Sequence, residues 1–218
     1  MIIAIDGVSG SGKSTISKLL AKELKMNRFN VGMVYRALTK YFSDKGIFPD
    51  QLTNFDKIKI EVWFEEDAQN IKINGESFKN EELRTTKITN LVTKYSEIEK
   101  LREVVREFQR EYAKDNDVLM EGRDITSEVL PNADHKFFIT CSYLERSKRR
   151  KDDIEKLGEK ISQKQVVDKL FERDYDDATR TVSPLKLVRG VKVIDTSKLS
   201  IDETIKKLTK EIGGKNAL

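Results

Sequence analysis

The chain has 218 residues, with 41 lysines and arginines against 37 aspartates and glutamates, and a formal net charge of +4 at pH 7. This length suits one domain with a sizeable core, and the mild positive charge favours anionic small molecules, so we expect no nucleic-acid partner. A single cysteine, Cys141, excludes an internal disulfide and is typical of a reducing compartment. We therefore expect a monomeric cytoplasmic protein that crosses no membrane.

The N-terminal residues read as a strand, a glycine-rich loop and a helix. Residues 2–6 are apolar and β-branched, and residues 15–24 carry apolar side chains at helical spacing. Between them lies a full match to G-x-x-x-x-G-K-[ST], followed by a threonine: Gly7, Val8, Ser9, Gly10, Ser11, Gly12, Lys13, Ser14 and Thr15. In this context the pattern predicts an ATP-binding phosphate loop. Lys13 would reach the β- and γ-phosphates, and Ser14 would ligate Mg²⁺.

Four further segments are predicted to be strands, which gives five candidate strands in all. They are residues 28–31, 118–120, 136–141 and 191–195. The last three are each followed by a turn or polar stretch and usually by a helical pattern, which indicates βα alternation and a parallel sheet. The final helix is expected over 201–212, with Ser200 as its N-cap and Glu203 completing a capping box.

Two segments interrupt this alternation. Residues 62–64 and 70–73 are strand-like, and Asn74-Gly75 is a strong hairpin-turn signal, so the sequence predicts a small antiparallel insert. Amphipathic helices are expected next, over 81–92 and 97–114. Residues 149–180 form a second insert that is highly charged and holds few large apolar residues.

The phosphate loop alone fits kinases, switch GTPases and motor ATPases. The guanine-specific Asn-Lys-x-Asp motif is absent, as is a Walker-B Asp-x-x-Gly after a strand. Instead, arginines lie at predicted loops and strand ends: Arg36, Arg84, Arg123, Arg173 and Arg180. Phosphoryl transfer between two anions needs such charges, because donor and acceptor repel each other, and the arginine fork binds phosphate bidentately.

The sequence around each arginine favours a functional role for some of them more strongly than for others. Arg123 follows a strand in a Gly-Arg-Asp segment, which places it at a carboxyl end of the sheet, where open α/β folds bind ligands. Glu121, at the same strand end, is a candidate group near Mg²⁺. Arg149 and Arg150 fit a phosphate contact and a solvated helix surface equally well. The single histidine, His135, begins a predicted strand and gives a histidine-based mechanism little support.

Motifs along nearly the whole chain carry a family resemblance. They are residues 5–15, 32–37, 82–85, 121–125, 129–133, 145–150, 173–174, 183–185 and 195–197. Through them the chain resembles the bacterial cytidylate kinase family, the (d)CMP kinases of the nucleoside monophosphate kinase group. The Gly-Arg-Asp segment at 122–124 and the Ser-Pro-Leu segment at 183–185 are more particular to that family than the phosphate loop is.

The resemblance implies a single α/β domain, a three-layer P-loop sandwich with a five-stranded parallel sheet. Its core would span about 1–30, 115–148 and 181–218, its monophosphate-binding region about 31–114 with a β insert near 61–78, and its helical lid about 149–180. It also implies Mg²⁺-dependent transfer of the ATP γ-phosphate to CMP or dCMP.

The resemblance further implies roles for individual residues. The catalytic set would be Lys13, Arg123, Arg173 and Arg180, and Arg150 would bind ATP. Arg36 would join the arginines on the phosphates. The cytosine edge would face Thr93, Arg102 and Asp124, and Asp177 would hold the sugar hydroxyls; Tyr35 and Arg84 complete the substrate-binding set. A carboxylate, an arginine and a hydroxyl can together read the donors and acceptors of cytosine.

Four positions depart from the family pattern. Asn30 and Val31 stand where a carboxylate and a hydroxyl are usual, Glu121 replaces an aspartate, and Thr126 replaces a glycine. The phosphotransfer residues are intact, but the acceptor pocket differs. Two alternatives therefore stay open: a P-loop kinase of another nucleotide or small metabolite, and a nucleotide-binding regulatory module without catalysis.

Overall fold

The computed structural model describes residues 1–66, 68–156 and 160–213. The chain divides into two compact units, the first comprising Met1–Met26 with Leu119–Leu218 and the second Asn27–Val118. Among the described helices, none is both long enough and apolar enough to span a membrane.

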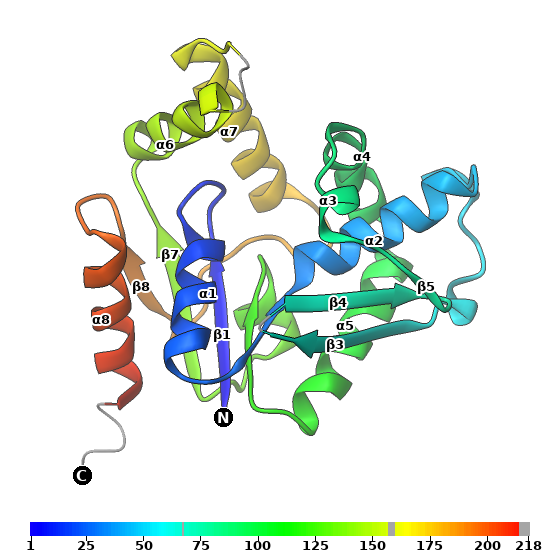
Figure 1. The fold of residues 1–218 in the computed structure, drawn as a ribbon, viewed down its shortest axis with the longest axis horizontal. Helices are drawn as coiled ribbons and strands as arrows, with labels where there is room; N and C mark the ends of the chain where they lie inside the picture. The colour runs from blue at the N-terminus through cyan, green and yellow to red at the C-terminus, as the bar shows by residue number, and fades with distance from the viewer. Residues whose placement is uncertain (67, 157–159, 214–218) are drawn as a thin grey trace. The chain divides into compact units, whose positions relative to one another are not determined.

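A five-stranded sheet has the strand order β2-β6-β1-β7-β8 (Figure 1). Its strands are β1 (Ile2–Gly7), β2 (Asn27–Asn30), β6 (Val118–Glu121), β7 (His135–Thr140) and β8 (Lys192–Asp195). Strands β1 and β7 pair in parallel, with Ile3 opposite His135 and Gly7 opposite Ile139, and β8 continues in parallel beside β7. The predicted five-stranded parallel sheet is confirmed, and each of its strands lies within one or two residues of its predicted position.

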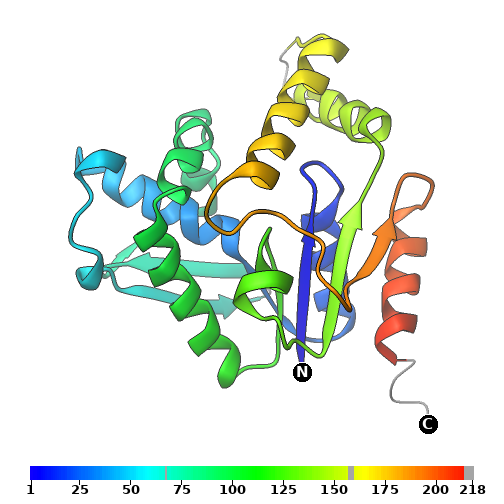
Figure 2. The same ribbon diagram turned by 180° about the vertical axis from the view of Figure 1, so that it is seen from behind.

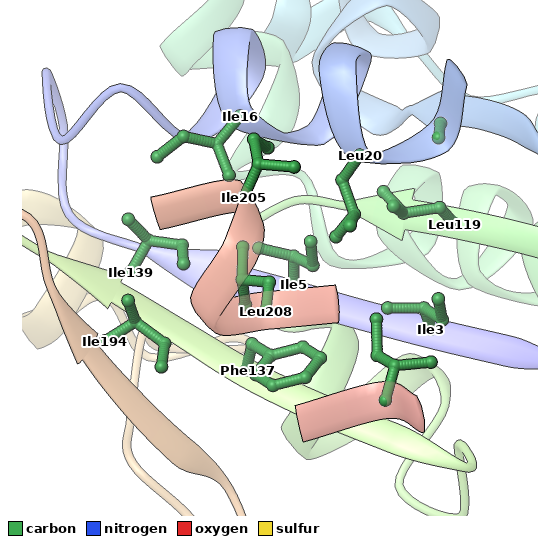
Figure 3. Close-up of a cluster of buried hydrophobic side chains, with 12 residues drawn as sticks. Ile3, Ile5, Ile16, Leu20, Leu119, Phe137, Ile139, Ile194, Ile205 and Leu208 are labelled. Carbon is green, nitrogen blue, oxygen red and sulfur yellow. The ribbon is translucent and has the colours of Figure 1, made fainter. Parts of the chain in front are cut away.

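The core of the first unit lies between this sheet and two helices, α1 (Lys13–Glu23) and α8 (Ile201–Gly213). Figure 3 shows the side chains of both helices pointing at those of β1 and β7. The cluster includes Ile16 and Leu20 from α1, Ile205 and Leu208 from α8, and Phe137 from β7. Removing such side chains from water is worth roughly 1.5–3 kcal/mol each, which fixes α1 and the loop before it on the sheet.

Capping fixes where α8 begins. The Ser200 amide donates to Glu203 Oε2 at 2.8 Å, and the Glu203 amide donates to Ser200 Oγ at 3.2 Å. This reciprocal pair satisfies two amides of the first helical turn. The predicted capping box is confirmed.

Three helical segments of the first unit bear on the site: α6 (Tyr143–Lys156), α7 (Gln163–Thr179) and η3 (Ile125–Val129), a short π-helix. Figure 1 shows α6 and α7 side by side beyond the loop that joins β1 to α1, and Figure 2 shows η3 on the sheet face opposite α1. The charged insert expected over 149–180 is therefore helical, but α6 begins before it, at Tyr143. The Ser142 carbonyl accepts the Arg146 amide and so starts the helix earlier. Residues 157–159 of the insert lie outside the described residues.

The second unit combines helices with a three-stranded sheet of order β3-β4-β5. Its elements besides β2 are α2 (Val31–Asp44), the 3₁₀ turns η1 (Pro49–Gln51) and η2 (Phe55–Lys57), β3 (Ile60–Glu65), β4 (Ala68–Ile73), β5 (Glu76–Ser77), α3 (Asn80–Leu83), α4 (Thr86–Ser96) and α5 (Glu99–Lys114). The predicted antiparallel insert is confirmed. The Asn74-Gly75 turn joins β4 to the short strand β5, whereas β3 ends before Glu66, which takes a positive φ of 47°.

The predicted helix over 81–92 is wrong in one respect, because it is two helices. Thr85 has extended backbone angles, and its hydroxyl accepts the Ile88 amide at 3.4 Å as the N-cap of α4. A threonine that caps the second helix ends the first, since its side chain competes with the helical backbone bonds. The next helix, α5, begins at Glu99, two residues after the predicted start.

Candidate functional site

The loop between β1 and α1 has a backbone that only its glycines permit. A Cβ built on Gly7 would lie 2.1 Å from the Ile139 carbonyl oxygen, so the close approach of β7 leaves no room for a side chain. Gly12, the residue before α1, has a φ of +84°, where side chains are strained. The Ser11 hydroxyl closes the loop by donating to the Val8 carbonyl at 3.0 Å. The loop thus leads into the N-terminus of α1, a suitable place for an anion.

Lys13 opens α1 and is buried, with 8% of its surface exposed. Burial, followed by the nearby charge of Arg123, lowers the pKa of Lys13 to about 7, although Glu121 and Asp6 oppose the shift. Desolvation of an ammonium group disfavours its charged form. An anionic phosphate beside it would restore that form, so Lys13 is suited to hold a polyphosphate.

Ser14 and Glu121 meet at the loop. The Ser14 hydroxyl donates to Glu121 Oε2 at 3.0 Å, and Glu121 is almost fully buried at the end of β6. A hydroxyl beside a carboxylate is an oxygen donor set of the kind that Mg²⁺ prefers. The structure thus brings these two predicted residues together.

A carboxylate joins two of the predicted catalytic arginines. Arg123 Nε donates to Asp177 Oδ2 at 2.7 Å, and Arg180 Nη1 lies 3.5 Å from Asp177 Oδ1. Burial alone would raise the pKa of Asp177, but Arg123, Arg180 and Arg173 outweigh it and hold that pKa below its usual value. Asp177 therefore stays ionised and fixes Arg123 in place. Because a carboxylate has about four lone-pair positions, it can also accept a bond from a sugar hydroxyl.

Asp6, at the end of β1, holds the segment that follows β6. Its buried carboxylate accepts the amides of Ile125 and Thr126, at 3.0 and 2.7 Å, and the Thr126 hydroxyl at 2.7 Å. Burial raises the pKa of Asp6, and the bonds from Thr126 and Ile125 oppose that shift. The threonine that departs from the family pattern thus supplies two of the three bonds that fix η3 directly after Arg123 and Asp124, and a glycine could not make the one from the hydroxyl.

The second unit holds five of the predicted substrate residues. Arg102 is buried on α5, its guanidinium lies 5.5 Å from the Tyr35 ring centroid, and its Nη1 donates to the Ser96 carbonyl at 2.8 Å. Arg36, on α2, donates to the Leu83 carbonyl at 2.9 Å and to the Thr89 hydroxyl at 3.0 Å. The ring and a backbone carbonyl thus hold Arg102, and a carbonyl and a hydroxyl hold Arg36, so both arginines are preorganised.

The remaining predicted residues differ in exposure. Arg84 and Thr93, in the second unit, and Arg150 and Arg173, in the first, are exposed, whereas Asp124 is buried. Arg173 is nevertheless close enough to Lys13 and Asp177 for its charge to affect both pKa values. The residue before Arg150, Arg149, lies close to the phosphate loop instead. Its Nη2 donates to the Thr196 carbonyl at 3.1 Å, and its Nη1 would lie 3.8 Å from a Cβ built on Gly12.

Sequence reasoning assigned no role to three residues that contact the phosphate loop or its neighbours: Arg146, Asp174 and Thr196. Arg146 and Asp174 are both buried and both bind Ser9. The Thr196 hydroxyl donates to the Ser11 carbonyl at 3.2 Å. Their only sequence signal was membership of the matching motifs, since charged residues on charged helices otherwise predict a solvated surface.

Comparison with known proteins identifies the family. The family model for cytidylate kinase matches residues 3–213. A cytidylate kinase of Clostridium botulinum strain Langeland is 38% identical over 206 residues, which cover 94% of each chain. A cytidylate kinase of Clostridium tetani is 34% identical and covers 97% of this chain and 93% of its own.

Solved structures support the fold. A shikimate kinase of Bacteroides thetaiotaomicron has a TM-score of 0.50 and 12% identity over 97% of this chain and 98% of its own. An uncharacterized protein of Eubacterium ventriosum has a TM-score of 0.53 and 16% identity, with the same coverage. At such identities the likeness concerns the fold alone. With the family match over nearly the whole chain and the two clostridial relatives, we conclude that the chain belongs to the cytidylate kinase family.

Proposed function

We propose that the protein transfers the γ-phosphate of ATP to CMP or dCMP, giving ADP and CDP or dCDP, with Mg²⁺ bound. The observation that carries this proposal is the carboxylate-linked pair Arg123 and Arg180, which belongs to the same compact unit as the phosphate loop and Lys13. Family membership supplies the reaction, and this arrangement supplies charges for it. Cytoplasmic localisation and a monomeric state stay predictions.

The reaction requires positive charge around the phosphates rather than a general base. The acceptor phosphate is already ionised, so attack on the γ-phosphorus requires positioning and charge neutralisation. In our proposal Lys13 holds the donor phosphates, while Arg123 and Arg173 neutralise the oxygens of the transferring group. His135 pairs with Ile3 at the amino end of β1, whereas the phosphate loop begins at Gly7, at the other end of that strand. The histidine is therefore at the wrong end of the strand for catalysis.

Mg²⁺ would be held by the Ser14 hydroxyl together with phosphate oxygens of the nucleotide, and Glu121 would orient that hydroxyl. When bound, the ion would neutralise phosphate charge.

Substitution of either residue is expected to weaken the response to magnesium. Glu121→Gln should raise the Mg²⁺ concentration for half-maximal rate by about tenfold, because partners of a metal ligand commonly contribute that much to affinity. Ser14→Ala, which removes the proposed ligand, should have the larger effect. Titrating the rate with MgCl₂ at saturating nucleotide measures both, and Ser77→Ala, at an exposed serine of β5, is the control. An unchanged magnesium response in both site variants would contradict this placement of the ion.

From the family resemblance, acceptor-binding roles are proposed for two sets of residues. They are Tyr35, Arg36, Arg84, Thr93 and Arg102 in the second unit, and Asp124, Asp177 and Arg180 in the first. Within the second unit, the two residues that depart from the family pattern make contacts that hold the fold together. The Asn30 amide donates to Gln69 Oε1 at 2.6 Å, and Val31 is buried. With valine at position 31 this loop offers no hydroxyl, so base-reading roles are proposed for Thr93 and Arg102 in the second unit and for Asp124 in the first.

A panel of acceptors tests the proposal. ADP formation is coupled to NADH oxidation and measured with CMP, dCMP, UMP, AMP, GMP and shikimate at matched concentrations. We expect turnover with CMP and dCMP to exceed that with every other acceptor. Turnover confined to another acceptor would support the alternative suggested by Asn30 and Val31, a P-loop kinase of a different substrate. Nucleotide binding without turnover on any acceptor would support the regulatory module.

A further inference from the structure

Two helices send one charged side chain each to the same residue of the phosphate loop. Arg146, on α6, donates from Nη1 to the Ser9 carbonyl at 2.8 Å, and Asp174, on α7, accepts the Ser9 amide on Oδ1 at 2.9 Å. Arg146 Nη1 also donates to Asp174 Oδ2. Both polar groups of the Ser9 backbone are therefore bound by an ion pair that itself joins α6 to α7.

This ion pair is buried and held from several sides. Only 2% of Arg146 and 9% of Asp174 is exposed. The Arg146 guanidinium lies 4.1 Å from the Tyr143 ring centroid, which further restricts its position. Because buried ion pairs often contribute little net stability, stability alone is a weak explanation for two charges at this place.

The contacts of α7 show what the pair positions. Asp174 binds Ser9, and Asp177, three residues further along the same helix, binds Arg123 at 2.7 Å. Residues three apart lie on one helical face. This face of α7 is therefore attached at two points, once to the phosphate loop and once to the arginine proposed to act on the transferring phosphate. Arg173 directly precedes Asp174 on the same helix, four residues before Asp177.

The adjacent loop residue supports the same attachment. Gly10 has a φ of +71°, and a Cβ built there would lie 3.4 Å from Leu170 Cδ2 and 3.6 Å from Arg146 Cβ. Leu170 is on α7, four residues before Asp174. Side chains of both helices thus lie beside Gly10, next to the residue that they bind, Ser9.

We infer that Arg146 and Asp174 are a positioning pair, which holds the second half of α7 on Ser9 so that Arg173 and Arg123 keep a fixed distance from the phosphate loop. Neither residue touches substrate in this scheme; they act through α7. It follows that this half of α7 stays attached to the loop without nucleotide, and that any lid closure moves only the parts of α6 and α7 beyond the pair.

This inference rests on the proposed phosphoryl transfer for its kinetic consequence, but its structural consequence can be measured separately. The main variant is the double substitution Arg146→Met with Asp174→Leu. It removes every side-chain bond to Ser9 and replaces the ion pair by apolar groups, an exchange that buried pairs often tolerate. Asp176→Asn, at an exposed carboxylate of the same helix, is the matched control.

We expect the double variant to lose about 100-fold in kcat with CMP, as small misplacements of catalytic groups do, while KM for ATP changes by less than about threefold. Without nucleotide, hydrogen exchange of the amides in residues 170–179 should be at least about tenfold faster than in the wild type. The control should match the wild type in both measurements.

Several results would overturn the inference. One is a folded double variant whose kcat stays within about twofold of the wild type. Another is a loss of kcat accompanied by an equal rise in KM, which would indicate a binding role. A third is unchanged hydrogen exchange in α7. If the wild type proves inactive on CMP, the proposed function fails, but the exchange measurement still decides whether the pair attaches α7.

Should the double variant not fold, two conservative variants take its place. Asp174→Asn keeps an acceptor for the Ser9 amide but removes the charge that holds Arg146. Arg146→Lys keeps a charge but lacks the rigid guanidinium that places Nη1 against both partners. Each is expected to lose about tenfold in kcat with little change in KM for ATP. Wild-type kcat in both would contradict the positioning role.

Discussion

Replacing Arg123 with alanine is expected to lower kcat by about 10³-fold, because an arginine that neutralises a transferring phosphoryl group contributes on that scale. Arg123 Nε donates to Asp177 Oδ2 at 2.7 Å, so the guanidinium is held in position before substrate binds. A mobile neighbouring side chain cannot replace a group that is held in this way. KM for ATP should change much less, since the interaction is strongest in the transition state. Steady-state kinetics with ATP and CMP measure both values.

Two further variants sharpen this test. Arg123→Lys should recover only part of the activity, because an ammonium group lacks the planar fork. Arg189→Ala, at an exposed arginine of the same unit, controls for the loss of one positive charge. If Arg123→Ala kept nearly full activity, Arg123 would have no place on the phosphate.

Lys13→Met is expected to reduce kcat/KM by at least about 10²–10³-fold, since it removes a charge aimed at the donor phosphates. The lowered pKa of about 7 adds a sharper consequence. As pH rises through that value, Lys13 in the empty site loses its proton, and a bound triphosphate raises the pKa again. Calorimetric titration of ATP at about pH 8, in buffers of different ionisation enthalpy, should therefore show uptake of nearly one proton.

A titration at lower pH and two lysine variants are the controls for this prediction. At about pH 5.5 Lys13 is protonated with or without nucleotide, so no proton should be taken up by this residue. The Lys13→Met variant should lose the uptake at the higher pH, whereas Lys18→Met, on the exposed face of α1, should retain it. Burial of Lys13 also makes the stability of the protein depend on pH, because its pKa is lower in the folded than in the unfolded chain. Burial therefore lowers the free energy of unfolding by its full amount below pH 7 and by less as pH rises. Equal proton uptake in Lys13→Met and the wild type would contradict this account.

The elements predicted well from sequence are those whose cause is local. The strand before the phosphate loop is a run of β-branched residues, the loop needs glycine where φ is positive, and α8 begins at a reciprocal cap between Ser200 and Glu203. Each depends on residues close together in the chain. The family motifs added the arginine set.

The errors in the fold have local causes that a pattern of apolar spacing does not register. Thr85 ends one helix and caps the next, although the apolar positions around it continue at helical spacing. The strand β5 is two residues long, too short to be predicted from alternation.

The site residues that sequence reasoning missed depend on contacts between distant segments. Asp6 binds Thr126, and Asp174 binds Ser9 across 165 positions in the chain. A charged side chain on a charged helix predicts a solvated surface, and only the packing of α6 and α7 buries Arg146 and Asp174. Whether such a residue is buried depends on which distant residues it contacts, and the residue type alone does not show this.

In the proposed function, this phosphate loop and its arginines transfer phosphate to a cytidine monophosphate and not to water. The most direct measurement follows the label from [γ-³²P]ATP, with Mg²⁺ and CMP or dCMP, by anion-exchange chromatography. In the wild type the label is expected to move into CDP or dCDP, and in Arg123→Ala and Lys13→Met this transfer should be slower by at least about 10²-fold. Label that appears only in inorganic phosphate, or in the diphosphate of another base when acceptors compete, would contradict it.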